Sequence, residues 1–179
     1  ETTSAITIVT PTDDLDILAN TVGVAFDGVE IRLMGDDGVV VPPGHAGEVQ
    51  TRSIYNLLGY WRRPEATAQA FTADGWFRTG DVAEQRADGR YRLVGRLKEM
   101  YKSGGYNVYP REVEDAIHSH PDVIMAAVVS RPDPLWQEVG VAFVVAREGT
   151  SSEALEAYCR ERLANYKLPK AFILCDSLP

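Results

Sequence analysis

The sequence predicts an α+β protein with a β-rich first part and a smaller, mixed second part. Strand-like alternation dominates the first part, whereas the second combines amphipathic helix patterns with near-continuous apolar runs. The charge pattern changes at the same place, because all four lysines follow residue 97. We therefore expect one unit over residues 1–95 and another over residues 96–179.

The first part shows strand, helix and turn signals in succession. Alternation of apolar and polar residues predicts strands at Val29–Met34 and Gly47–Arg52. Pro64 stands where a helix would start, which predicts a short helix over Glu65–Phe71. An Ala-Asp-Gly turn at residues 87–89 predicts a hairpin that pairs residues 82–86 with residues 90–94.

The second part predicts alternating strands and helices. Proline at the first turn and early acidic residues predict a helix over Pro110–His118. Thr150 and Glu153 form a capping-box pattern that predicts the start of a second helix. The expected strands are Glu99–Ser103, Val123–Ser130, Val139–Ala146 and Ala171–Cys175.

Composition excludes several classes of protein. With 18 basic and 26 acidic residues the net charge is −8, which argues against a nucleic-acid partner. The apolar runs are shorter than the roughly 20 residues of a transmembrane helix, and the chain does not open with a signal-peptide pattern. Cys159 and Cys175 form no CxxC motif, so we expect reduced thiols in a cytoplasmic protein. The three histidines lack metal-site spacing.

Four short polar segments each allow a structural and a functional interpretation. Asp81, after a glycine, forms an Asx-turn or cap, or accepts hydrogen bonds from both hydroxyls of a ribose. Arg96 is a surface ion-pair partner or a forked donor to phosphate or ribose oxygens. Gly104 and Gly105 form a turn, or let an extended ligand approach the backbone. Lys98 and Lys102 are solvated lysines unless further motifs say otherwise.

Taken together, these segments resemble the adenylate-forming superfamily, which contains acyl- and aryl-CoA synthetases, adenylation domains of peptide synthetases and firefly-type luciferases. The resemblance spans nearly the whole chain and is greatest to the fatty-acid and aryl-CoA synthetases. The segments that carry it are Gly59–Trp61, Pro64–Thr67, Gly75–Asp81, Tyr91–Lys98, Tyr101–Pro110, Glu112–Glu114 and Asn165–Lys170.

The resemblance implies an ATP-dependent carboxylate–CoA ligase, with a fatty acid as the expected substrate. A carboxylic acid first attacks the α-phosphate of Mg²⁺-bound ATP, and CoA then expels AMP from the acyl-adenylate. ATP or AMP, Mg²⁺ and coenzyme A are the implied cofactors. Two alternatives stay open: an adenylation domain that loads a carrier protein, and a non-catalytic nucleotide-binding fragment.

The resemblance assigns roles to five residues on the nucleotide side. Asp81 would hold the ribose hydroxyls, Arg96 would assist there, and Leu93 would pack beside the nucleotide. Lys98 matches the hinge between the large domain and the mobile C-terminal domain. Glu1 would close a Tyr-Gly-x-Thr-Glu motif and contact Mg²⁺.

A second group would serve the thioester-forming step. Lys102, Ser103, Gly104 and Gly105 would lie on the face presented to CoA, with the glycines lining the pantetheine channel. Lys102 would also approach the nucleotide, and Tyr106 would contact CoA. Trp136, like the other two tryptophans, is interpreted as a packing residue.

The resemblance also implies that the chain is part of a longer enzyme. Residues 1–95 would be the β-rich end of its N-terminal domain, and residues 96–179 its mobile C-terminal domain. The phosphate loop would precede residue 1, and a terminal catalytic lysine would follow residue 179. We therefore expect that these 179 residues alone form no AMP from ATP.

Overall fold

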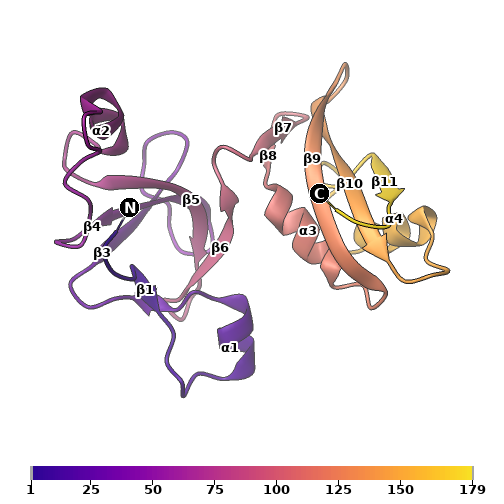
Figure 1. Cartoon of the computed structure of the whole chain (residues 1–179), viewed down its shortest axis with the longest axis horizontal. Coiled ribbons are helices and arrows are strands. Elements are labelled where there is room, and N and C mark those ends of the chain that lie inside the picture. Colours follow the sequence, from indigo (N-terminus) through magenta and orange to yellow (C-terminus); the bar gives the residue numbers. More distant parts are fainter. Residues whose placement is uncertain (1, 179) are drawn as a thin grey trace. The chain divides into compact units, whose positions relative to one another are not determined.

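The structure is a computed structural model that describes residues 2–178, and its contacts divide the chain into two compact units. The units are Glu1–Leu97 and Lys98–Pro179 (Figure 1), so the division falls two residues beyond the expected boundary between residues 95 and 96. The first unit combines helices with antiparallel sheets and the second combines helices with a mixed, mainly antiparallel sheet, which confirms the predicted α+β class.

The first unit is built on a four-stranded antiparallel sheet in the order β3-β4-β5-β6. Leu33, Val49, Ala83 and Tyr91 form the buried cluster on this sheet. A separate ribbon pairs β1 with β2. The elements are β1 (Thr7–Ile8), α1 (Leu15–Asn20), β2 (Val24–Ala25), β3 (Glu30–Met34), β4 (Ala46–Arg52), α2 (Pro64–Ala70), β5 (Phe77–Gln85) and β6 (Tyr91–Arg96).

The second unit is organised around strand β10. This strand pairs antiparallel with β9 and β7 and parallel with β11, while β8 pairs with β7 at the end of the sheet. The elements are β7 (Tyr101–Ser103), β8 (Tyr106–Val108), α3 (Pro110–His118), β9 (Val123–Asp133), β10 (Gln137–Ala146), α4 (Ser152–Arg160) and β11 (Ala171–Leu174).

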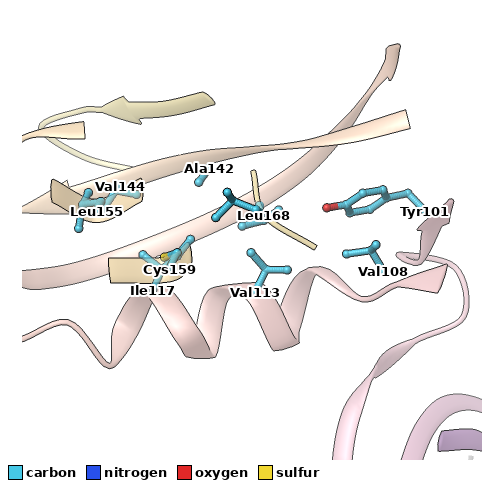
Figure 2. Packing of buried hydrophobic residues seen from close by; sticks show 10 residues of the cluster. Tyr101, Val108, Val113, Ile117, Ala142, Val144, Leu155, Cys159 and Leu168 are labelled. Carbon is cyan, nitrogen blue, oxygen red and sulfur yellow. The ribbon is translucent and has the colours of Figure 1, made fainter. Parts of the chain in front are cut away.

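Helices α3 and α4 pack against this sheet and enclose its core (Figure 2). Val113 and Ile117 of α3 and Leu155 and Cys159 of α4 are fully buried in this core, which also contains residues of β9 and β10. Burial of each such aliphatic side chain contributes about 1.5–3 kcal/mol. Burial also raises the pKa of the Cys159 thiol to about 11, so this cysteine stays a neutral core residue.

The helix boundaries differ from the expectation at two places: α2 begins and ends one residue earlier than expected, and α4 has a different N-cap. Helix α4 takes Ser151 as its N-cap, whose Oγ accepts a hydrogen bond of 3.2 Å from the Ala154 N–H. The predicted cap at Thr150 was wrong by one residue, because the Thr150 N–H closes the preceding turn on the Arg147 carbonyl. Helix α1, which Asp14 caps through the Ile17 N–H, was not predicted.

Side chains of α3 accept hydrogen bonds from outward-facing N–H groups of the edge strand β9. The Ala126 N–H donates to His118 Nε2 at 3.0 Å, and the Val128 N–H donates to Glu114 Oε1 at 2.8 Å. The other nitrogen of His118 lies 2.9 Å from the Glu114 carbonyl, so Nδ1 is the donor and Nε2 the acceptor. Helix α3 therefore covers the edge as well as the face of the sheet.

Tyr101 carries an unusual polar group into the core. Among the described residues, its hydroxyl is the one fully buried side-chain nitrogen or oxygen atom without a hydrogen-bond partner. A Cβ atom at Gly140 would lie only 2.4 Å from this hydroxyl, so the side chain fits only because residue 140 is glycine. Burial, aided by the nearby Glu138 charge, raises the pKa of Tyr101 to about 12.

We predict that Tyr101→Phe stabilises the chain by about 1 kcal/mol, because it removes a buried polar group that has no partner. Urea unfolding of the two proteins measures the difference. Tyr158→Phe is the matched control: it deletes a hydroxyl that donates to the Ser119 carbonyl at 2.7 Å, and we expect it to destabilise. A destabilised Tyr101→Phe protein would show that a buried water serves the hydroxyl.

The raised pKa of Tyr101 also predicts a difference at alkaline pH. The phenol ionises near pH 10 in the unfolded chain and near pH 12 in the folded one. Its contribution to stability is therefore present below pH 10 and is lost as the pH rises towards 12. The stability advantage of Tyr101→Phe should widen between pH 10 and pH 11. Unfolding curves at both pH values test this, and a constant difference would contradict it.

Candidate functional site

Asp81 lies in an irregular part of strand β5. Glu48 of β4 pairs with Val82 and Gln50 pairs with Arg78, so Thr79, Gly80 and Asp81 together face Val49 alone. The Thr79 hydroxyl bridges this bulge, since it donates to the Val49 carbonyl at 2.8 Å and accepts from the Asp81 N–H at 3.0 Å. Gly80 adopts a φ of +74°, which only glycine takes without strain. The Thr-Gly-Asp sequence thus forms a bulge that re-aims Asp81.

A second bulge brings Arg96 opposite Asp81. The β5–β6 hairpin pairs residue 83 with residue 93, but residue 82 pairs with residue 95, so Val94 is an extra residue on β6. Without that insertion Asp81 would face Gly95. With it, Arg96 Nε lies 3.0 Å from Asp81 Oδ1.

The Asp81–Arg96 pair is open to solvent, with 32% and 66% of the two side chains exposed. An exposed ion pair stabilises a fold by less than about 1 kcal/mol, so its position is not explained by stability. A carboxylate offers roughly four acceptor positions, and the contact with Arg96 uses one oxygen. Asp81 can therefore accept hydrogen bonds from vicinal hydroxyls while Arg96 remains beside it.

Leu93 lies on the same strand, three residues before Arg96, and is 47% exposed. An exposed leucine on this strand can pack against an apolar ring. Leu97, one residue beyond the strand, donates its N–H to the Gly80 carbonyl at 2.9 Å and ties the end of β6 to the bulge. Asp81, Leu93 and Arg96 thus all lie on the β5–β6 hairpin of the first unit, and the Asp81–Arg96 ion pair brings two of them together.

Lys98 is the first residue of the second unit. Its side chain is exposed and its backbone lies in a turn between β6 and β7. Lys98 belongs to neither β6 nor β7, so no strand pairing restricts its backbone dihedral angles.

The glycine segment forms a tight hairpin in the second unit. Ser103 pairs with Tyr106, and Gly104 and Gly105 form the two-residue turn between β7 and β8. Their φ angles of +57° and +85° are typical of a type I′ turn, which glycine favours at both central positions. Lys102 and Tyr106 are exposed beside this turn, whereas the Ser103 side chain is buried.

This hairpin is surrounded by residues that were expected only to pack or that had no expected role. Tyr106 stacks on Tyr166 with ring centroids 4.5 Å apart. The Lys170 ammonium lies 4.7 Å from the ring centre of Trp136, and the Gly104 N–H donates to the Trp136 carbonyl. Trp136 was expected only to pack, and no local pattern in the sequence connects it with a glycine 32 residues earlier.

The first unit also contains a polar cleft of about 470 Å³ that the sequence analysis missed. Arg32 donates to Gln50 and to both carboxylate oxygens of Asp74, and Gln50 donates to the buried Glu48. The hydrogen bond from Arg32, with a second from Thr72, lowers the pKa of Asp74 to about 2. Arg78 and Leu97 of the motif segments line this cleft, but none of the residues with an expected role in binding or catalysis does.

No group of three His, Cys, Asp or Glu side chains within residues 2–178 is arranged to hold a metal ion. Glu1, the expected Mg²⁺ contact, lies outside the described residues. No helix in the described part of the chain is both long and apolar enough to span a membrane.

Comparison with known proteins agrees with these motifs. Residues 112–179 match the AMP-binding enzyme C-terminal domain. Feruloyl-CoA synthase of Amycolatopsis sp. is 46% identical over 159 residues, which cover 88% of this chain and 32% of that protein. A long-chain-fatty-acid–CoA ligase of Mycobacterium tuberculosis is 44% identical over 162 residues, covering 90% of this chain and 32% of that ligase.

A solved structure shows the same fold over nearly the whole chain. It is o-succinylbenzoate CoA synthetase of Bacillus subtilis in complex with its acyl-adenylate intermediate. The two chains are 33% identical with a TM-score of 0.86, and the match covers 98% of this chain and 36% of that one. The chain thus spans about a third of the length of the relatives it matches. With its ordered motifs and this shared fold, the chain belongs to the adenylate-forming superfamily of AMP-binding enzymes.

Proposed function

We propose that this chain is the C-terminal third of an ATP-dependent carboxylate–CoA ligase whose acid is a fatty acid. The observation that carries the proposal is the exposed Asp81–Arg96 pair, which two bulges place together at the end of the β5–β6 hairpin. Similarity to a long-chain-fatty-acid–CoA ligase supports the choice of acid, while feruloyl-CoA synthase makes an aryl acid the competing substrate.

In the first half-reaction, a substrate carboxylate oxygen attacks the α-phosphorus of Mg²⁺-bound ATP, and pyrophosphate leaves. Asp81 accepts hydrogen bonds from the ribose hydroxyls, and Arg96 donates to a ribose oxygen. Leu93 packs beside the nucleotide. These contacts hold the α-phosphate in place and so lower the entropic part of the barrier. The metal ion that accompanies ATP would offset the charge that builds up on the phosphates.

In the second half-reaction, the CoA thiolate attacks the acyl carbonyl, the bond to the AMP oxygen breaks, and AMP leaves. Rotation at Lys98 would bring the Lys102–Tyr106 hairpin to the thioester site, since a hinge needs only a few backbone dihedrals to change. Gly104 and Gly105 present backbone without side chains, so an extended pantetheine arm can pass close to them. Lys102 would supply a positive charge near the nucleotide.

The enzyme that contains this chain, supplied with Mg²⁺, ATP and a panel of fatty and aryl acids, tests the proposed function. AMP release that requires both CoA and a fatty acid supports it. If the acid supports exchange of pyrophosphate into ATP but CoA has no effect on AMP release, the acyl acceptor is another molecule, such as a carrier protein. The isolated 179 residues are expected to form no AMP.

We predict that Asp81→Ala in that enzyme raises the KM for ATP about 10- to 100-fold. The loss of hydrogen bonds to a charged carboxylate is worth about 1.5–3 kcal/mol. Initial rates of pyrophosphate exchange at varied ATP concentration measure the change.

Glu84→Ala is the matched control for Asp81→Ala. Glu84 lies on the same strand and forms the same kind of cross-strand ion pair, with Arg92 Nη2 at 2.9 Å. Its removal should leave the KM for ATP within about twofold, as for an exposed ion pair. Equal effects of the two substitutions would refute the ribose contact.

A proline at the hinge should separate the two half-reactions. We predict that Lys98→Pro slows one half-reaction at least about 10-fold more than the other, because proline fixes φ near −65° and permits fewer backbone states. Lys98→Ala removes the charge but leaves the backbone free, so its effect should be far smaller. Single-turnover assays of acyl-adenylate formation and of its CoA-dependent decay measure the two steps. Equal slowing of both steps by Lys98→Pro would argue against a hinge.

A further inference from the structure

The Gly104–Gly105 turn is in contact with the tip of the β9–β10 hairpin through one of its two glycines. The Gly104 N–H donates to the Trp136 carbonyl at 2.8 Å. A Cβ atom built on Gly104 would lie 2.7 Å from Cε3 and 2.9 Å from Cζ3 of the Trp136 ring. A Cβ atom on Gly105 would meet no heavy atom within 4 Å. The indole ring therefore lies against the backbone of the turn at Gly104 and leaves Gly105 open.

Trp136 is itself fixed from several directions. Asp133 Oδ1 accepts hydrogen bonds from the N–H groups of Leu135 and Trp136, at 2.9 and 3.0 Å. The Lys170 ammonium lies over the indole ring, which adds a cation–π attraction. The next residue, Gln137, has a φ of +69°, a backbone conformation that residues other than glycine rarely adopt.

The strained residue has a structural purpose at this point of the sheet. Gln137 pairs with Asp133 across the hairpin and with Ser103 of β7. Its left-handed backbone thus allows the chain to turn at Trp136 and still join the strand that leads into the glycine turn. A non-glycine residue persists in such a conformation only where the surrounding contacts fix it.

A turn made of two glycines needs such support. Glycine has more backbone freedom than any other residue, so two in succession would sample many conformations. The hydrogen bond and the ring contact at Gly104 both restrict that freedom, and both come from Trp136.

We propose that Trp136 is a positioning residue that holds the Gly104–Gly105 turn in the conformation required for attack by CoA. This inference rests on the proposed function, because it takes the turn as part of the thioester-forming face. Trp136 acts through the turn, so its role depends on Gly104.

Coupled substitutions test the contact in the 179-residue chain without any assay of activity. Gly104→Ala and Gly105→Ala both place a side chain at a positive φ, but only the first also meets the indole ring. We expect Gly104→Ala to lower the melting temperature about 2–4 °C more than Gly105→Ala does. In a Trp136→Ala background this difference should disappear. A difference of the same size in both backgrounds would overturn the proposal.

The intact enzyme tests the consequence for catalysis. Trp136→Ala should lower the rate of CoA-dependent decay of the acyl-adenylate about 10- to 100-fold, since small misplacements near reacting groups have effects of this size. Acid-dependent pyrophosphate exchange should stay within about twofold. Trp136→Phe keeps an aromatic ring against Gly104, so it should retain most of the rate that Trp136→Ala loses. The retained pyrophosphate exchange shows that Trp136→Ala is still folded.

The outcomes separate the two proposals. Absence of acid-dependent pyrophosphate exchange in the unmodified enzyme would refute the proposed function. Normal exchange together with a normal CoA step in Trp136→Ala would refute the positioning role alone. If Trp136 instead touches CoA directly, the effects of Trp136→Ala and Gly104→Ala on the CoA step should multiply independently, which would also overturn the proposal. Strongly non-additive effects support it.

Discussion

Strand β10 hydrogen-bonds to three other strands, and the second unit is assembled on these bonds. Its pairing with β9 and β11 forms the surface on which α3 and α4 pack. A single further pair, between Gln137 and Ser103, joins β7 and hence the glycine hairpin to the same sheet. The part of this unit with a proposed role in chemistry is thus attached to the sheet through the start of β10, and to the core through the buried Tyr101 and Val108.

The first unit presents its polar residues by a different means. A regular antiparallel sheet would alternate its side chains and keep the register that the turn sets. Bulges at Thr79–Asp81 and at Val94 break that register in neighbouring strands, and the two shifts together bring an aspartate and an arginine face to face. The regular pairs below the bulges, such as Glu84 with Arg92, anchor the hairpin while its end is irregular.

Much of this architecture could be predicted from local patterns. The apolar run at Val139–Ala146 and the amphipathic pattern of α3 reflect burial in the finished core, so both elements were expected at nearly their observed positions. The β5–β6 hairpin was expected from its turn, but the bulge at Val94 was not, because nothing in that residue distinguishes it from a regular strand position. The contacts of Trp136 and Tyr166 with the glycine hairpin depend on tertiary packing between distant segments, which no local spacing encodes.

The way α3 covers strand β9 has a consequence beyond the fold of one molecule. An edge strand with free donors offers a template for pairing with the strands of other chains. His118 and Glu114 occupy two of these donors from within the same unit. Loss of these two side chains would therefore favour intermolecular strand pairing and lower the solubility of the protein at high concentration.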